Sequence, residues 1–206
     1  MPSPSRGLTQ PERVEISSRR LARAAAELII EKGWEATTAA EIGRRAGYSR
    51  AMVHARYGSK DAVLDAIFMR EYVAQLSPDL DPEANGLQYA LAHLDRIGQL
   101  AAEDPELLRA MFVAAFEAVK STSALRARSL GQLVVGMQKV EAGLKKGISD
   151  GSVRSDVDVR HAVNDISSAV YGIAYLWLVL DDGYDVKHEL NCLRARLIRD
   201  YGSAGD

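Results

Sequence analysis

The sequence predicts an all-α protein of about nine helices, in which a three-helix domain with a helix-turn-helix precedes a larger helical domain. Apolar residues recur three and four positions apart along most of the 206 residues. No stretch shows the alternation of a β-strand, and no hairpin dipeptide joins two such stretches. Clusters of Gly, Pro, Asp and Ser separate the periodic segments, so short turns are expected between the helices.

Composition places the chain among ordinary globular proteins. Hydrophobic residues make up 47% and charged residues 26%, which allows a sizeable core. With Cys192 alone there is no intrachain disulfide and no CxxC motif, which favours a reducing cytoplasm. Residues 1–11 lack the apolar segment of a signal peptide, so we expect a disordered arm and no secretion. The longest apolar run, residues 169–180, is shorter than the roughly 20 residues that span a bilayer, so no membrane partner is expected.

The first helix is predicted over residues 16–31, with Gly33 ending it and Trp34 filling the core beside it. Thr38 and Glu41 have the spacing of a capping box, which predicts a second helix from there to residue 46. Gly47 supplies the turn that follows.

Ser49 is predicted to cap a third helix that ends at Tyr57. A fourth helix is expected after Ser59, and its apolar stripe would comprise Leu64, Ile67, Phe68 and Tyr72. These helices form the predicted N-terminal domain, residues 12–76.

Residues 77–86 are dense in Pro, Asp and Gly and predict the start of a second domain, residues 77–206. Asp81-Pro82 and Asp104-Pro105 each look like an N-cap followed by proline in the first turn, which predicts helices to about residues 102 and 120. Three more are expected: a long helix over residues 123–149, one from about 158 to about 182, and one over 186–201.

The two short helices around Gly47, with a longer helix before them, have the layout of a helix-turn-helix whose second helix enters the DNA major groove. The charge distribution agrees. Residues 1–60 hold 11 Lys and Arg against 6 Asp and Glu, a net charge of +5, whereas the rest of the chain holds 15 against 22, a net of −7. A positive segment of this kind suits a polyanionic partner.

Helical geometry assigns faces to the third helix. Val53 and Tyr57 share the face expected to pack on the first helix, so the opposite face holds Ala51 and Ala55, flanked by Met52 and His54. That face has little bulk and permits a close approach to base edges, with alanine methyls available to thymine methyls. Base hydrogen bonds are then left to Arg50 or His54.

Several short segments carry a family resemblance. In order they are Ala25-Ala26-Glu27-Leu28, Glu31-Lys32-Gly33-Trp34, Thr37-Thr38, Glu41-Ile42, Arg45-Ala46-Gly47-Tyr48-Ser49-Arg50 and Tyr57-Gly58-Ser59-Lys60-Asp61. Together they resemble the N-terminal signature of the TetR family of regulators. The resemblance implies a DNA-binding regulator in which Lys60 contacts phosphate.

The chain departs from the usual pattern of that family near the recognition helix. His54 stands where a tyrosine is usual, Arg56 where a histidine is usual, Tyr48 in place of a small aliphatic residue and Ala51 in place of a glycine. These departures concern the operator sequence rather than DNA binding. The predicted DNA contacts are Thr38, Arg44, Ser49, Arg50, Ala51, Met52, His54, Ala55 and Lys60.

The apolar run at residues 169–180 leaves no polar stripe on its helix, which predicts burial on one side by the domain's own core and on the other by a second subunit. The small residues Ser168 and Gly172 allow close approach of helices, and Leu190, Leu193 and Leu197 would complete a C2 homodimer interface. The same pair of helices forms the interface in the family resembled. The alternative is a monomer in which this helix is wholly internal.

Aromatic and polar side chains of the second domain predict a pocket for a small apolar effector. Its expected lining is Tyr89, His93, Met111, Phe112, Phe116, Tyr171 and Tyr175. Core packing explains most of these residues equally well, and no ligand is named by the sequence.

An enzyme is not expected. The four histidines lack the spacing of metal ligands, and no nucleophile or phosphate-binding motif occurs, so neither a metal nor a cofactor is predicted. The competing hypothesis is a helical protein–protein interaction module that does not bind DNA. For a TetR-type regulator, repression relieved by an effector is the commonest mode, and activation stays open.

Overall fold

The computed structural model describes residues 9–66, 81, 83–121, 124–180 and 183–203. Within them lie α1 (Gln10–Lys32), α2 (Ala39–Arg45), α3 (Arg50–Tyr57), α4 (Lys60–Asp65), α6 (Gly86–Glu103), α7 (Pro105–Glu117), α8 (Ala124–Asp150), α9 (Val159–Leu180) and α10 (Val186–Tyr201). The only β-pairing among these residues is an isolated bridge between Val153 and Gly202. The all-α prediction is confirmed.

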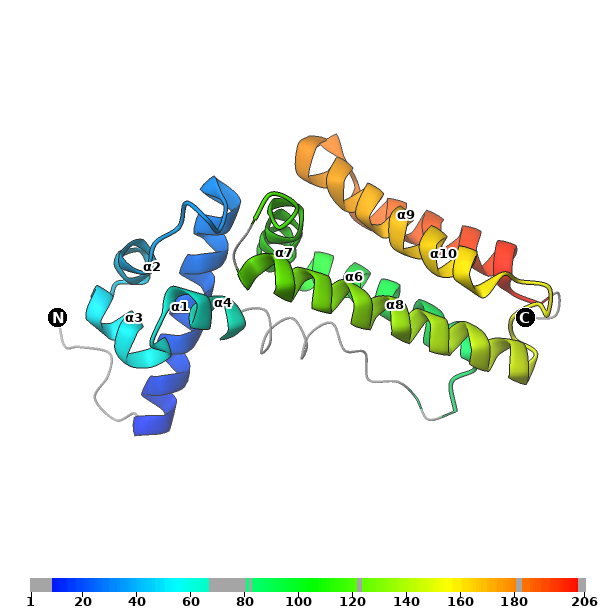
Figure 1. The fold of residues 1–206 in the computed structure, drawn as a ribbon, viewed down its shortest axis with the longest axis horizontal. Helices are drawn as coiled ribbons and strands as arrows, with labels where there is room; N and C mark the ends of the chain where they lie inside the picture. The colour runs from blue at the N-terminus through cyan, green and yellow to red at the C-terminus, as the bar shows by residue number, and fades with distance from the viewer. Residues whose placement is uncertain (1–8, 67–80, 82, 122–123, 181–182, 204–206) are drawn as a thin grey trace.

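The helices form two groups (Figure 1). Helices α1 to α4 gather at the N-terminal end, and α6 to α10 form the larger group. Helix α7 lies between them, where it packs against α1, and the start of α8 meets α4. The two groups are therefore connected by direct helix contacts as well as by the chain.

Helix α1 begins earlier than the sequence pattern predicted. The Thr9 side chain accepts a hydrogen bond from the Glu12 backbone, and the Glu12 carboxylate accepts one from the Thr9 N–H, which makes a complete capping box. The predicted disordered arm at residues 1–11 therefore overlaps this helix at its last residues, and the start predicted at residue 16 is wrong. Residues 1–8 lie outside the described part of the chain.

Local signals predicted the ends of most other helices correctly. Thr38, Ser49 and Asp104 cap α2, α3 and α7, each accepting a backbone hydrogen bond on its side chain. Helix α10 spans the predicted residues 186–201. Leu64, the first residue of the apolar stripe predicted for α4, is buried in the core. The other predicted stripe residues, Ile67, Phe68 and Tyr72, lie outside the described part of the chain.

The start of α6 was predicted wrongly. Its cap is Asn85 rather than Asp81. The Asn85 side chain accepts a hydrogen bond from the Gln88 backbone N–H, and the Gln88 side chain accepts one from the Asn85 backbone N–H. The Asp81 carboxylate instead accepts from the Glu83 N–H two residues on, in an Asx turn.

Helices α6 and α8 pack backbone to backbone. A Cβ built on Gly86 would clash with the backbone of Gly147, and one built on Gly143 would clash with the backbone of Ala90. Glycines four apart on α8 thus face small residues four apart on α6, which lets the helix axes approach closely. This contact is the most extensive helix pair in the described structure and was not predicted.

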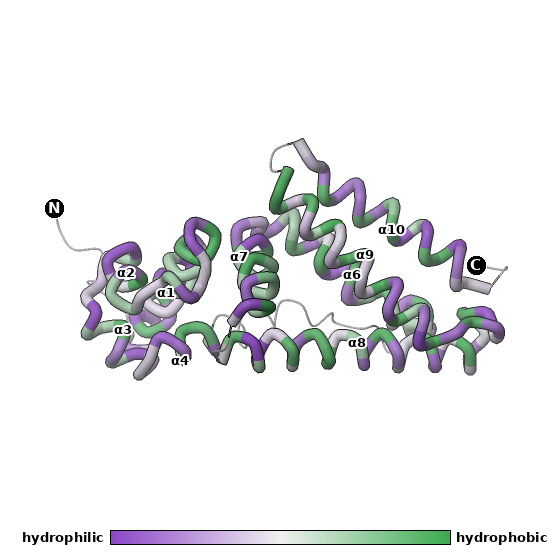
Figure 2. Tube along the Cα trace, turned by 45° about the horizontal axis from the view of Figure 1, so that its top comes forward, coloured by the Kyte–Doolittle hydropathy of each residue, from purple (hydrophilic) through white to green (hydrophobic). Residues whose placement is uncertain are grey.

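Helix α9 has one buried and one exposed apolar face. Ile166, Val170 and Trp177 are buried, whereas Tyr175 and Val179 are 55% and 59% exposed. By length and composition alone α9 is apolar enough to cross a membrane, but it packs along α8 and α10. Figure 2 shows the hydrophobic end of α9, and we call Tyr175, Leu176, Val179 and Leu180 the apolar face of α9.

The leucine stripe of α10 faces inward. Leu190, Leu193 and Leu197 are at most 6% exposed, because α10 packs on α6 and α9 of the same chain. These three residues therefore have almost no surface left for a second subunit, and their assignment to a dimer interface is corrected. Ser168 and Gly172 are exposed on α9, as an interface would require.

Candidate nucleic-acid interface and ligand site

The turn between α2 and α3 has helix-turn-helix geometry. Gly47 has φ of +78°, a backbone conformation that side-chain-bearing residues rarely adopt, and the Tyr48 N–H donates to the Gly43 carbonyl at 2.7 Å. Ser49 then caps α3 by accepting from the Met52 N–H at 3.2 Å. The turn predicted at Gly47 is confirmed.

One face of α3 is fixed against α1. Val53 is 1% exposed in the core, the Tyr57 hydroxyl lies 3.4 Å from the Ser18 carbonyl of α1, and the Arg56 guanidinium donates to the Ser17 hydroxyl at 2.8 Å. The orientation of α3 therefore follows from core packing and two polar contacts.

The opposite face of α3 is open to solvent. Arg50, Ala51, His54 and Ala55 are exposed and Met52 is half-buried, which is the arrangement that helical geometry predicted. On α2, Arg44 is also exposed, and the structure shows no hydrogen bond or ion pair from Arg44 or Arg50 to the described residues. Two cations thus remain available beside a face of small side chains.

The other predicted contacts are engaged within the protein. Thr38 is held in its capping box with Glu41, where bonds from Lys32 and Thr38 lower the pKa of Glu41 to about 2. The Lys60 ammonium lies 4.6 Å from the centre of the Trp34 ring and donates to the Glu35 carbonyl at 3.2 Å. Burial lowers the Lys60 pKa. Lys60 is turned toward the core of the N-terminal group rather than toward the exposed face of α3.

A carboxylate of α7 holds the turn that follows α1. Glu117 accepts hydrogen bonds from the backbone N–H groups of Trp34 and Glu35 at 2.5 and 3.0 Å, and the Ser121 hydroxyl donates to the Glu35 carboxylate at 2.5 Å. A Cβ at Gly33 would lie 2.8 Å from the Glu117 carboxylate, so glycine permits this approach. We call this contact the Glu117 clamp. Sequence reasoning missed it because its partners are more than 80 positions apart.

A second link joins α4 to α8. The Arg128 guanidinium binds the Asp65 carboxylate through two nitrogens, one of them at 2.6 Å. Arg128 precedes Ser129, which lines the pocket described next.

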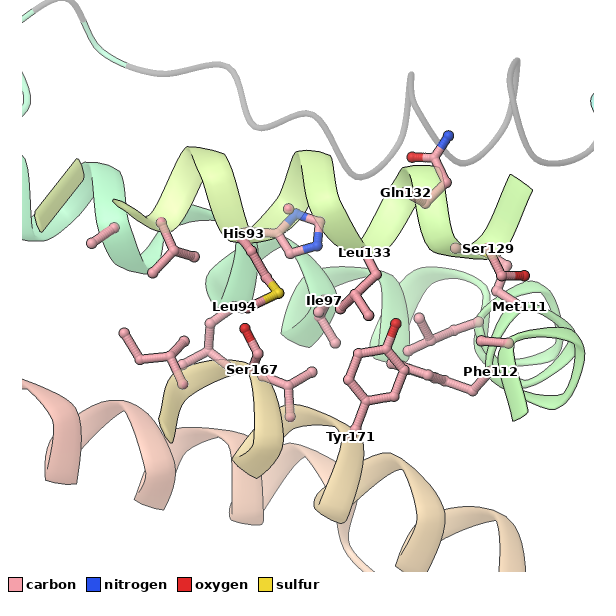
Figure 3. Close-up of a pocket in the computed structure, with 18 residues that line it drawn as sticks. His93, Leu94, Ile97, Met111, Phe112, Ser129, Gln132, Leu133, Ser167 and Tyr171 are labelled. Carbon is pink, nitrogen blue, oxygen red and sulfur yellow. The ribbon is translucent and has the colours of Figure 1, made fainter. Parts of the chain in front are cut away.

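The larger group encloses a cavity of about 70 Å³ between α6, α7, α8 and α9, which we call the inner chamber (Figure 3). The structure brings four of the predicted lining residues together around it: His93, Met111, Phe112 and Tyr171. Tyr171 rises from α9 toward Leu133 of α8, and its ring meets Phe112 edge to face at 5.9 Å. Burial raises the pKa of Tyr171.

The other three predicted pocket residues lie outside the inner chamber. Tyr89 lies at the far end of α6, where the Lys146 ammonium sits 4.3 Å from its ring centre. Phe116 meets both Tyr171 and Tyr175 edge to face at 5.9 Å, and Tyr175 is on the surface. Phe116 instead lines a surface groove of about 520 Å³ between α7, α8 and α9, which we call the outer groove.

Comparison with known families and structures agrees with this geometry. Residues 21–67 match the model of the bacterial regulatory proteins, tetR family. No curated protein matches the chain significantly.

Solved structures share the fold over almost the whole chain. The TetR regulator TylP of Streptomyces fradiae has 19% identity and a TM-score of 0.69, covering 95% of this chain and 90% of TylP. FadR of Bacillus subtilis, in complex with stearoyl-CoA, has 22% identity and a TM-score of 0.71, covering 87% and 97%. SmeT, in complex with triclosan, has 22% identity and a TM-score of 0.73, covering 92% and 93%.

Proposed function

We propose that this chain is a cytoplasmic repressor of the TetR type. It binds a palindromic operator as a dimer until a small apolar effector releases it. The exposed face of α3 is the observation that carries this proposal. Ala51 and Ala55 leave room for base edges and can contact thymine methyls, while Arg50 can bind guanine through two hydrogen bonds. The capped start of α2 and the exposed Arg44 supply contacts to phosphate.

We expect Arg44→Ala and Arg50→Ala to weaken DNA binding in different ways. Loss of Arg44 removes a phosphate contact, so affinity falls for every duplex and the salt dependence loses about one phosphate per subunit. Loss of Arg50 costs about 1–3 kcal/mol on the preferred operator and relaxes base preference at one position per half-site. Fluorescence anisotropy at several salt concentrations, with operators selected from genomic fragments, measures both effects.

Arg199→Ala is the matched control, because Arg199 is exposed near the C-terminus, at the opposite end of the molecule from α3 (Figure 1). It should leave affinity and salt slope unchanged. A change of base preference in Arg44→Ala with an intact salt slope would reverse the two roles. Failure of the wild-type protein to bind any genomic fragment would remove the operator proposal and favour a protein-interaction module.

The dimer proposal now depends on the apolar face of α9. Four exposed large apolar residues near one helix end are an unusual surface for an isolated subunit, and Gly172 nearby offers open space for a second helix. Two-fold pairing through α9 would present two α3 helices to successive major grooves, about 34 to 36 Å apart.

We expect Val179→Asp to weaken dimerisation at least about 100-fold, because two copies of a carboxylate would be buried without a partner. Val135→Asp on α8 places the same charge on a residue of comparable exposure outside this face and should leave the dimer intact. Sedimentation velocity at micromolar concentration distinguishes the results. A monomeric wild type, or a dimer that survives Val179→Asp, would contradict the interface.

Effector control is supported by the path from the inner chamber to the N-terminal group. Helix α7 carries Phe112 at the chamber and Glu117 at the clamp, while α8 carries Ser129 at the chamber and Arg128 at its link to α4. A ligand that shifts α7 or α8 would therefore alter the position of α1 or α4. To invert occupancy from 1:99 to 99:1, the ligand must favour one state by roughly 10⁴-fold.

A further inference from the structure

The lining of the inner chamber is mainly apolar. Among the described residues that line it, none is Asp, Glu, Lys or Arg, and most are Ala, Leu, Ile, Val, Met or Phe. The polar side chains of the lining are those of His93, Ser129, Gln132, Ser167 and Tyr171. A charged group placed in this chamber would lose its hydration and find no Asp, Glu, Lys or Arg of the described lining to pair with, which is strongly unfavourable.

Ser129 is the one lining residue whose polar atom is both buried and unpaired in the described structure. Its hydroxyl oxygen is shielded from solvent and has no hydrogen-bond partner there. Buried hydroxyls are normally bonded, because leaving one unpaired forfeits its hydration. A ligand hydroxyl or carbonyl reaching Ser129 would satisfy it.

The inner chamber and the outer groove share a wall. Ser129, Leu133, Met137, Ser167 and Tyr171 line both cavities. At about 70 Å³ the chamber is smaller than the roughly 150 Å³ cavity that holds one benzene ring, whereas the groove measures about 520 Å³. The unbranched side chain of Met137 can adapt its shape, so a ligand with its inner end in the chamber can extend into the groove.

We propose that this two-part site takes an uncharged, elongated, mainly apolar molecule, whose one neutral polar group hydrogen-bonds to Ser129. The inference rests on the proposed function only in naming this molecule the effector. The class excludes ligands whose inner end carries a carboxylate, a phosphate or an ammonium group.

Three probes of the same shape test the proposal on the full-length protein without DNA: biphenyl-4-ol, biphenyl and biphenyl-4-carboxylate at neutral pH. Calorimetric titration and thermal denaturation measure their binding. We expect biphenyl-4-ol to bind best, biphenyl about two- to tenfold more weakly for want of one hydrogen bond, and the carboxylate more than about 100-fold more weakly. Ser129→Ala should abolish the preference for biphenyl-4-ol over biphenyl, while Ser149→Ala, at the exposed end of α8, should retain it.

The outcomes separate this inference from the proposed function. Binding of the carboxylate with affinity equal to that of biphenyl-4-ol, no binding of any probe, or an unchanged preference in Ser129→Ala would overturn the inference. If biphenyl-4-ol binds as expected but leaves the operator complex intact in anisotropy titrations, the site is confirmed and effector control by it is wrong.

Discussion

Replacing Gly143 by alanine is expected to lower the free energy of unfolding by about 3 kcal/mol, because the new methyl group would overlap the backbone of Ala90 and force α6 and α8 apart. Backbone cannot move aside as a side-chain tip can, so the whole helix pair must shift. For a chain of this length the melting temperature should fall by roughly 6–12 °C. Thermal and urea denaturation of the full-length protein measure both quantities.

Gly131→Ala on the same helix is the matched control. A Cβ there meets nothing within 4 Å, so alanine should be neutral or stabilise the protein by up to about 1 kcal/mol through its higher helix propensity. Equal effects of the two substitutions would show that α6 and α8 are not in backbone contact. The comparison removes the general effect of a Gly to Ala change in a helix.

Helix positions were largely predictable because caps act locally. Thr38, Ser49 and Asp104 each bond a backbone N–H within three residues, so their sequence neighbours contain the whole interaction. The same signal was present at Thr9 and Glu12 but was obscured by the Pro- and Ser-rich residues before it. At Asp81 the capping pattern gave a wrong prediction, because Asp and Asn side chains also accept backbone hydrogen bonds in turns that begin no helix.

Which neighbour covers an apolar stripe was not predictable. Periodicity showed that Leu190, Leu193 and Leu197 share a face of α10, but α6 of the same chain and a second subunit would bury them equally well. The close approach of α6 and α8 left a readable trace, since Gly143 and Gly147 are four apart, as are Gly86 and Ala90. Only the fold shows that these two pairs face each other.

In the candidate site, too, local features could be predicted from the sequence and contacts between distant residues could not. The exposed face of α3 follows from helical geometry within eight residues, so sequence reasoning found it. The Glu117 clamp and the link between Asp65 and Arg128 join residues 63 to 83 positions apart. Neither has a local signature, although both connect the larger group of helices to the N-terminal group.

We expect Glu117→Ala to uncouple effector binding from operator release. The carboxylate accepts two backbone hydrogen bonds from the turn after α1, and alanine accepts none, so a shift of α7 would no longer pull directly on that turn. Allosteric coupling is typically about 5- to 150-fold in affinity, and in the variant this factor should fall toward one. Operator affinity, measured by anisotropy with and without saturating biphenyl-4-ol or an effector found by thermal shift, gives the factor directly.

Glu106→Ala is the control, because Glu106 also lies on α7 and binds α1, through Arg23 at 2.8 Å, but both side chains of that pair are more than half exposed. Exposed ion pairs contribute at most about 1 kcal/mol, so the coupling should survive its loss. Thermal denaturation must show that Glu117→Ala is folded, and calorimetry that it still binds the ligand. If release persists in Glu117→Ala but is lost in Asp65→Ala, the signal passes through α4 and α8, and the clamp only stabilises the turn. If the clamp variant alone loses release, then a ligand among the aromatic rings of α7 acts on DNA through one carboxylate and the two backbone amides that it holds.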